Sequence, residues 1–346
     1  MLRFGRRRRR ESGIPPAAFD AGLLGRDEVT LPGERARRLI NGRRVLITGA
    51  ASLVGAALAG CVARLDPAVL DLIEGAAPDA AGLLDVTRPH LVFHAAGSAA
   101  LAALEADPCE AVMVNVLATH RLVDAARTRG VERFVLISTD KAADPASVYG
   151  ATKRLAEMVA QTSAGSATCV ATARLGTVLS QDALRSMRAG EVVVLTHPEV
   201  ARNFMTAAEA AGLVIEAALL AEKSETFVLE MGGPTPVVAM VHRYAEQLGL
   251  PEVTIRFSGL GPGEKLAEQV FSQGEHQIRT AHPKIWATRP APLPAGLPPI
   301  LDALYGAARQ GDDGTVRMLL RRLLPEYRPL RRPDPIFTGP ESTWWM

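Results

Sequence analysis

Apolar positions in the first half of the chain alternate between short continuous runs and longer amphipathic stretches. The continuous runs predict buried strands, and they cover Arg44–Thr48, Ala68–Ile73, Leu91–His94, Arg133–Ser138 and Cys169–Leu175. The stretches between them predict helices, which include an alanine-rich run to about Arg64, Ala111–Arg129 and Tyr149–Ala160. Continuous apolar strands that alternate with helices are typical of a parallel sheet covered on both faces. The pattern therefore predicts an α/β fold of the Rossmann type, with a doubly wound parallel sheet.

Beyond residue 180 the pattern is less regular and predicts a smaller C-terminal α/β part. Its expected strands and helices are Glu191–Leu195, Thr226–Leu229, Ala207–Leu220 and Val238–Leu248. Residues 286–300 are rich in proline, which indicates a linker or an extended arm, and a helical pair ending at Leu324–Pro325 follows. We predict four segments, which are a basic tail with a lead-in helix near Glu34–Ile40 (1–41), the Rossmann domain (42–180), the smaller part (181–285) and the arm, helical pair and tail (286–346).

Composition narrows the function classes. The 346 residues carry a net charge of only +2, so we expect no general affinity for nucleic acid. The run Arg6–Arg10 is read as a solvated tail, with an anionic membrane surface as the alternative. No apolar stretch is long enough to span a membrane, and none follows the basic N-terminus as in a secretory signal. We expect a cytoplasmic protein, with the inner face of the membrane as the alternative location.

The three cysteines, Cys61, Cys109 and Cys169, are isolated along the chain. Their positions lack the spacing of a metal or redox motif, so we predict no metal site and a reducing compartment.

A candidate phosphate-binding turn follows the first long strand and precedes a helix. It has glycines at Gly49 and Gly55 and a serine at Ser52, between them. Glycines allow a tight turn and a close approach of the backbone to phosphates, and a helix N-terminus favours anions. Glu74 ends the next strand, where an acidic residue would bind ribose hydroxyls. Alternatively, the turn is a plain strand–turn–helix connection and Glu74 a solvated carboxylate.

Two groups of candidate catalytic residues surround the strand Arg133–Ser138. Tyr149 and Lys153 lie four apart and would share a helix face. An adjacent ammonium lowers the pKa of a phenol, which could then take a proton from a sugar hydroxyl. Thr139, Asp140 and Lys141 follow the strand at its carboxyl end, where open α/β sheets bind ligands. Asp140 and Lys141 could form an acid–base pair, or they could be a helix cap and a surface charge pair.

Several motifs together carry a resemblance to a known family. They are LISTDKAADPASVYGATKRLAE at Leu136–Glu157, Val92–Ala96, Asn115–Leu117, Thr196–Pro198, Arg202–Thr206, Pro262–Leu266 and His282–Ile285. In this order they resemble the CapD-like UDP-N-acetylglucosamine 4,6-dehydratases of polysaccharide biosynthesis, which are extended short-chain dehydrogenase/reductases. The resemblance covers about residues 22 to 328.

The resemblance implies a nucleotide-sugar enzyme that uses NAD or NADP. It would oxidise C4 of a UDP-N-acetylhexosamine, eliminate water across C5–C6 and return the hydride to C6. The implied catalytic residues are Thr139, Asp140, Lys141, Tyr149 and Lys153. The cofactor would be bound by Tyr149, Lys153 and a further set, namely Gly49, Ser52, Leu53, Val54, Gly55, Glu74, Ala95, Ala96 and Asn115. Arg202 and Lys265 would lie near the nucleotide diphosphate, and the protein would form homo-oligomers.

Other positions depart from the family pattern and keep alternatives open. Ser98, Ala99 and Ala100 replace a Tyr-Lys-His run, and the connection from Glu74 to Leu91 is too short for the usual third strand. A second deletion follows Ser180. The alternatives are a family member with impaired catalysis that acts in binding or assembly, and an NAD-dependent sugar-nucleotide epimerase.

Overall fold

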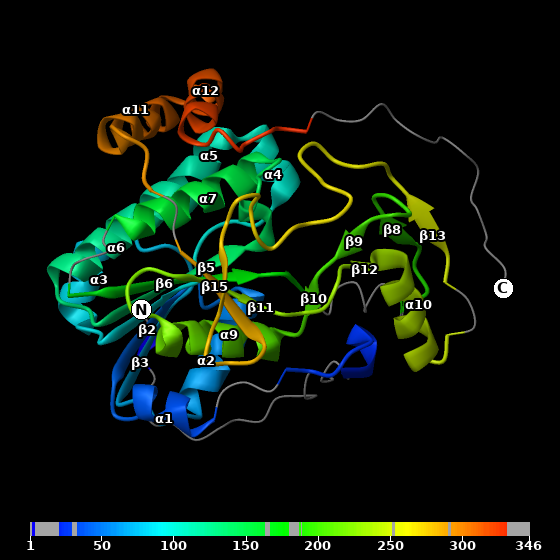
Figure 1. Ribbon diagram of the computed structural model, residues 1–346, viewed down its shortest axis with the longest axis horizontal. Helices are drawn as coiled ribbons and strands as arrows, with labels where there is room; N and C mark the ends of the chain where they lie inside the picture. Colours follow the sequence, from blue (N-terminus) through cyan, green and yellow to red (C-terminus); the bar gives the residue numbers. More distant parts are fainter. Residues whose placement is uncertain are drawn as a thin grey trace.

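The computed structural model is built around one large twisted sheet (Figure 1). It describes residues 2–3, 21–29, 33–162, 167–179, 187, 189–250, 253–289 and 292–330. Within these residues the sheet has nine strands. In spatial order they are β1 (Leu2–Arg3), β3 (Val69–Ile73), β2 (Arg44–Thr48), β4 (Leu91–His94), β5 (Arg133–Thr139), β6 (Cys169–Leu175), β11 (Thr226–Leu229), β15 (Ile285–Thr288) and β14 (Gln277–Arg279).

The six central strands, β3 to β11, run parallel, whereas β1, β15 and β14 pair in antiparallel fashion at the edges. The side chains of β4 are all buried, as are nearly all of those of β2 and β5, so both faces of these strands lie in the core. This arrangement confirms the Rossmann-type α/β fold predicted from the sequence. β11 lies in the predicted C-terminal part but pairs with β6 in the large sheet.

Helices cover both faces of the sheet (Figure 1). On one face lie α1 (Glu34–Ile40), α2 (Leu53–Ala63) and α9 (Ala207–Leu220), which share a hydrophobic core with the strands. On the other face lie α3 (Ala80–Thr87), α6 (Ala118–Thr128) and α7 (Val148–Gln161). A third layer, α11 (Leu297–Gln310) and α12 (Asp313–Leu323), packs on α7. Because α7 lies between the sheet and this layer, all 14 of its residues are buried.

The connection from β3 to β4 is short and consists of α3 alone. β3 and β4 lie on opposite sides of β2, so the chain crosses the sheet without an additional strand. The outer edge of β3 pairs instead with β1, where Leu2 lies opposite Leu72. This observation confirms that the short segment after Glu74 holds no third strand, and it shows that the parallel sheet forms without one.

The helix predicted over Ala111–Arg129 is more irregular than expected. It begins as α5 (Pro108–Ala111), passes through a π-helical segment, η2 (Val112–Leu117), and continues as α6. The proline-rich linker predicted over residues 286–300 is also shorter than expected. Its first residues complete β15, and α11 begins at Leu297 with prolines in its first turn, where a missing N–H is tolerated.

Two further short elements, α4 (Leu101–Ala106) and η3 (Asp140–Ala142), belong to the Rossmann half. A smaller lobe lies beside the carboxyl end of the sheet (Figure 1). Its elements are η1 (Ala21–Leu24), β7 (Thr177–Val178), β8 (Val193–Leu195), β9 (Ala201–Arg202), β10 (Phe204–Met205), β12 (Thr235–Pro236), α10 (Val237–Gln247) and β13 (Ile255–Phe257). Leu23 of η1 is buried in the core of this lobe.

The lead-in segment is fastened to the rest of the fold by Arg26, whose guanidinium bonds both carboxylate oxygens of Glu209 at 2.6 and 3.0 Å. Arg6–Arg10, Ser180 and Trp344–Trp345 lie outside the described residues. Among the residues that the structure covers, no helix combines the length and apolar character needed to cross a membrane.

Candidate active site

The carboxyl end of β5 brings the predicted catalytic residues together. β5 ends at Thr139, the 3-10 turn η3 follows at once, and α7 begins at Val148. Ser147 caps α7 by accepting a hydrogen bond of 2.9 Å from the amide of Gly150. A β-carbon on Gly150 would lie 2.2 Å from the carbonyl oxygen of Lys141, so only glycine allows the turn and the helix to approach this closely. The Asp–Lys turn and the Tyr–Lys helix therefore form one site.

Asp140 is the buried centre of this site, with no exposed surface. One carboxylate oxygen, Oδ1, accepts hydrogen bonds from the Thr139 hydroxyl and from the Lys141 ammonium, each at 3.1 Å. The other oxygen, Oδ2, is buried and has no hydrogen-bond partner among the described residues. Leaving a buried carboxylate oxygen unbonded costs free energy, which is the pattern expected where a ligand group completes the bonding.

Tyr149 differs from the sequence-based prediction in the direction of its pKa. Burial raises the pKa of Tyr149 to about 12, while a hydrogen bond with the Thr139 side chain acts in the opposite direction. The negative charges of Asp140 and Glu268 raise the pKa further. We predicted a lowered value because of Lys153, and that prediction is wrong for this structure. The phenol is held as the neutral acid, since burial and two carboxylates disfavour the phenolate.

Lys153 points from α7 toward the end of β5. Its ammonium donates a hydrogen bond of 2.7 Å to the carbonyl oxygen of Ile137. Burial lowers the pKa of Lys153 to about 8, although the carboxylate of Glu157 opposes the change. The hydrogen bond therefore fixes the Lys153 side chain beside the end of β5.

The predicted phosphate-binding turn has the geometry that such a turn requires. Gly49 has a φ of 72°, and a β-carbon there would lie 2.4 Å from the backbone of Ala95. Ser52 is the N-cap of α2, because its hydroxyl accepts from the amide of Gly55 at 3.0 Å and donates to the carbonyl of Gly49 at 2.8 Å. The serine side chain therefore folds back into the turn, which leaves the space in front of the helix open.

The first turn of α2 and the ends of the neighbouring strands form one exposed edge. Leu53 is 44% exposed, and Ser52, Glu74 and Gly97 are also exposed. The amides of Leu53 and Val54 lie in the first turn of α2, where the helix offers no carbonyl four residues earlier, so they can bind an anion. These features fit the pyrophosphate and the adjacent ribose of a dinucleotide, with Glu74 at the end of β3.

Asn115 is buried, whereas a residue that contacts the cofactor directly would be accessible from outside. Its side-chain carbonyl oxygen accepts from the amide of Ser98 at 3.0 Å, and its side-chain amide donates to the hydroxyl of Thr152 at 3.1 Å. A β-carbon on Gly97 would lie 2.6 Å from this oxygen. Asn115 therefore joins the loop after β4 to α7. Ala95 and Ala96 lie in the same loop, which runs against the turn at Gly49.

Arg202 and Lys265 are brought together in the smaller lobe. The guanidinium of Arg202 bonds the carboxylate of Glu264 at 2.8 Å and the carbonyls of Lys265 and Leu266 at 3.0 and 3.1 Å. The ammonium of Lys265 donates to the carbonyl of Ala143 at 3.1 Å. Arg202 thus shapes the loop that carries Lys265, and Lys265 joins that loop to the Asp–Lys turn.

Glu268 was not among the residues predicted from the sequence. Its carboxylate is buried, lies 3.8 Å from the ammonium of Lys141 and 3.6 Å from that of Lys265. The sequence signal that could have pointed to Glu268 is its position two residues after the Pro262–Leu266 motif.

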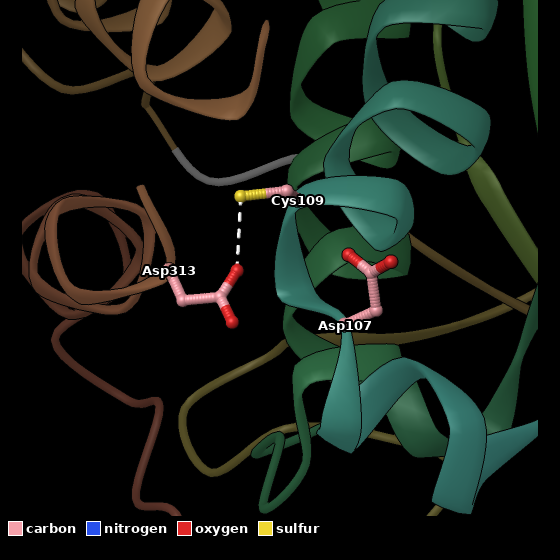
Figure 2. A group of neighbouring side chains, drawn as sticks. All are labelled: Asp107, Cys109 and Asp313. Carbon is pink, nitrogen blue, oxygen red and sulfur yellow. Dashed lines mark hydrogen bonds between the residues drawn. The ribbon is translucent and has the colours of Figure 1, made fainter. Parts of the chain in front are cut away.

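A second cluster lies away from this site, between α5 and α12 (Figure 2). Asp107, Cys109 and Asp313 are the described residues whose spacing could suit a metal ion. The thiol of Cys109 points at Asp313 and donates a hydrogen bond of 3.0 Å to its carboxylate. Burial raises the pKa of Cys109 to about 12, and the hydrogen bond to Asp313 adds to the effect. The hydrogen bond between Cys109 and Asp313 links the segment of α5 to α12.

Curated relatives match most of this chain. CapD of Staphylococcus aureus, a capsular polysaccharide biosynthesis protein, is 33% identical over 304 residues, which cover 76% of this chain and 51% of CapD. The probable polysaccharide biosynthesis protein EpsC of Bacillus subtilis is 33% identical over 302 residues. The chain spans about half the length of these relatives.

Solved structures support the fold. Pen from Bacillus thuringiensis superposes with a TM-score of 0.66 at 23% identity, and covers 74% of this chain and 89% of Pen. MoeE5, in complex with UDP-glucuronic acid and NAD, has a TM-score of 0.58 at 24% identity over 66% of this chain and 89% of MoeE5.

A family model provides the assignment. The model described as "Polysaccharide biosynthesis protein" matches residues 76–290, which is more than half of the chain. The matched range contains the Asp–Lys turn, the Tyr–Lys helix and the loop that carries Glu268. The chain therefore belongs to the polysaccharide biosynthesis protein family.

Proposed function

We propose that the protein is a nucleotide-sugar 4,6-dehydratase that acts on a UDP-N-acetylhexosamine in polysaccharide biosynthesis. One observation carries the proposal, namely that the Lys141 ammonium lies 3.1 Å from the buried carboxylate of Asp140 beside Tyr149. A Tyr–Lys pair suffices for oxidation or epimerisation at C4, whereas elimination of water also needs an acid and a base. The site contains the Tyr149–Lys153 pair and also the Asp140–Lys141 pair.

NAD(P)+ would bind along the edge formed by β2, β3 and β4. The first turn of α2 would receive the pyrophosphate, and Glu74 the ribose, which favours NAD over NADP because a carboxylate repels a 2′-phosphate. When bound, NAD(P)+ supplies a hydride acceptor. MoeE5 is described with NAD and a UDP-sugar, and this supports the same ligand classes here.

Tyr149 would take the proton of the C4 hydroxyl while the C4–H bond breaks with loss of hydride. The neutral phenol seen here has to become the base. The ammonium form of Lys153, one helical turn from Tyr149, is the group expected to favour the phenolate. Asp140 and Lys141 would then remove the C5 proton and protonate the departing C6 hydroxyl. Bound cofactor would supply the hydride for C6 and a proton would return to C5, so the net change would be loss of one water.

The test is incubation of the purified protein with UDP-N-acetylglucosamine and NAD+ or NADP+, followed by mass spectrometry. A product lighter by one water, and carrying a 4-keto group, is expected. Tyr149→Phe should abolish it, whereas Tyr244→Phe, a buried tyrosine of α10, should not. No product and no cofactor retained on purification would contradict the proposal and favour a binding or assembly role. Conversion at C4 without water loss would favour an epimerase.

The epimerase alternative has support from a further relative. UDP-glucose 4-epimerase of Rickettsia canadensis is 28% identical over 191 residues. Homo-oligomer formation and the four segment boundaries remain predictions, which size-exclusion chromatography and limited proteolysis would test.

A further inference from the structure

Glu268 reaches the candidate active site from the smaller lobe. It lies in the loop between β13 and β14, and its backbone carbonyl accepts a hydrogen bond of 3.2 Å from the side-chain amide of Asn203. The residue is 5% exposed. Its two carboxylate oxygens face different cations, Oε1 the ammonium of Lys141 at 3.8 Å and Oε2 that of Lys265 at 3.6 Å.

These distances distinguish Glu268 from an ordinary structural salt bridge. Both are longer than a hydrogen bond, and Oε2 has no hydrogen-bond partner among the described residues. Buried carboxylates that only hold a fold together are normally fully bonded, as Glu157 is to Ser138 and Arg174. Oε2 of Glu268 can therefore still accept a hydrogen bond, as can Oδ2 of Asp140.

The charges around Glu268 form a row of alternating sign. The row runs Asp140, Lys141, Glu268 and Lys265, with Tyr149 beside it. Burial raises the pKa of Glu268 and the charge of Asp140 raises it further, while Lys141, Lys265 and Arg202 act in the opposite direction. The same carboxylate raises the pKa of Tyr149. Glu268 is therefore coupled to both halves of the acid–base machinery.

We propose that Glu268 is a positioning residue of the reaction centre, which holds the Lys141 ammonium beside Asp140 and keeps a negative charge in the surroundings of Tyr149. The expected effect of Glu268 on turnover rests on the proposed dehydratase function. Its expected effect on the ionisation of Tyr149 does not. Because Glu268 comes from the smaller lobe, the acid–base pair of the Rossmann half is complete only when that lobe is in place.

The first test needs neither substrate nor cofactor. Ultraviolet difference spectra between about pH 9 and pH 11 follow the first part of phenolate formation, below the Tyr149 pKa of about 12, where the ionised fraction is proportional to the ionisation constant. Tyr149→Phe identifies the contribution of Tyr149. Glu268→Gln removes the charge and keeps the shape, so Tyr149 should ionise about half a pH unit lower, roughly a threefold change in its ionisation constant. Glu246→Gln, an exposed carboxylate on α10, should leave the titration unchanged. An unchanged titration in Glu268→Gln would overturn the electrostatic role.

The second test uses turnover of the wild-type protein as its reference. Glu268→Gln should lower kcat about tenfold or more with little change in KM, and Glu268→Asp should recover part of the loss. A loss that appears only in KM, or no loss at all, would overturn the positioning role. If the wild-type protein itself forms no product, the dehydratase proposal fails, and the spectroscopic titration still decides the placement of Glu268. Circular dichroism shows whether the Gln variant is folded. The titration of Glu268→Asp is the matched control, because this variant keeps the negative charge.

Discussion

Arg174 of β6 and Glu157 of α7 form a buried, bidentate ion pair next to β5. Nε of Arg174 donates to one carboxylate oxygen at 2.9 Å and Nη2 to the other at 2.7 Å, and neither side chain has exposed surface. Ser138 donates a third hydrogen bond to Glu157 at 2.6 Å. Burial alone would raise the pKa of Glu157, but Arg174 lowers it to about 2. The pair therefore stays ionised, and it ties α7 to β5 and β6.

Arg174→Met is expected to destabilise the protein strongly. It removes the nearer of the two guanidiniums that Glu157 and Glu275 share and leaves Arg154 as their remaining common cation. Breaking a buried ion pair costs about 3–5 kcal/mol. Arg127→Met breaks an exposed pair with Asp124 and should change stability little. Urea denaturation of both variants measures the difference. Equal stability of the two variants would show that the buried pair contributes nothing.

Lys153→Met is expected to change how stability depends on pH. Burial lowers the pKa of Lys153 from 10.5 to about 8, so between these values the unfolded chain binds more protons than the folded one. The stability of the wild type relative to the variant should therefore rise as pH increases from about 8 to 10.5, by at most about 3 kcal/mol. Denaturation of both proteins at several pH values tests this, and the comparison cancels the contributions of other groups. A difference independent of pH would contradict it.

Gly55→Ala and Gly60→Ala lie on the same helix, α2, and should have opposite effects. A β-carbon on Gly55 would lie 2.1 Å from the carbonyl oxygen of Gly49, so the phosphate-binding turn must move. At Gly60 the nearest atom is 3.8 Å away, the end of the Arg64 side chain. Alanine is favoured over glycine in a helix, so Gly60→Ala should stabilise by about 0.5–1 kcal/mol. Thermal denaturation distinguishes the two, and a stabilised Gly55→Ala would refute the close packing.

Ser52→Ala is expected to lower stability by about 1 kcal/mol, because it removes the N-cap of α2. Ser52→Gly should cost only a few tenths of a kcal/mol. It also leaves the front of the helix open, so NAD+ binding should be kept. Urea denaturation gives the stabilities and calorimetry the NAD+ affinity. Equal losses in the two variants would argue against a capping role for the serine.

The pattern of apolar and polar positions along the chain predicted most of the strands and helices. The bounds of β2, β4, β6 and α9 agree with the predictions, because each is a continuous apolar or amphipathic run with breakers at its ends. The interruption of the long helix by η2 was not predicted. The buried Asn115 of η2 forms hydrogen bonds with Ser98 and Thr152, which lie elsewhere in the chain. Helical periodicity depends only on residues that are close in sequence, so it cannot predict such contacts.

The sequence by itself determined the Rossmann order of elements, the glycine turn after the first long strand and the five candidate catalytic residues, since these depend on neighbours along the chain. Only the tertiary structure decided the state of those residues. The pKa of Tyr149 is raised rather than lowered, because burial and the charges of Asp140 and Glu268 act on it across space. Glu268 itself lies more than a hundred residues from Lys141 in the chain. Its role depends on how the smaller lobe packs, because electrostatic interactions follow distance in space and exclusion of water.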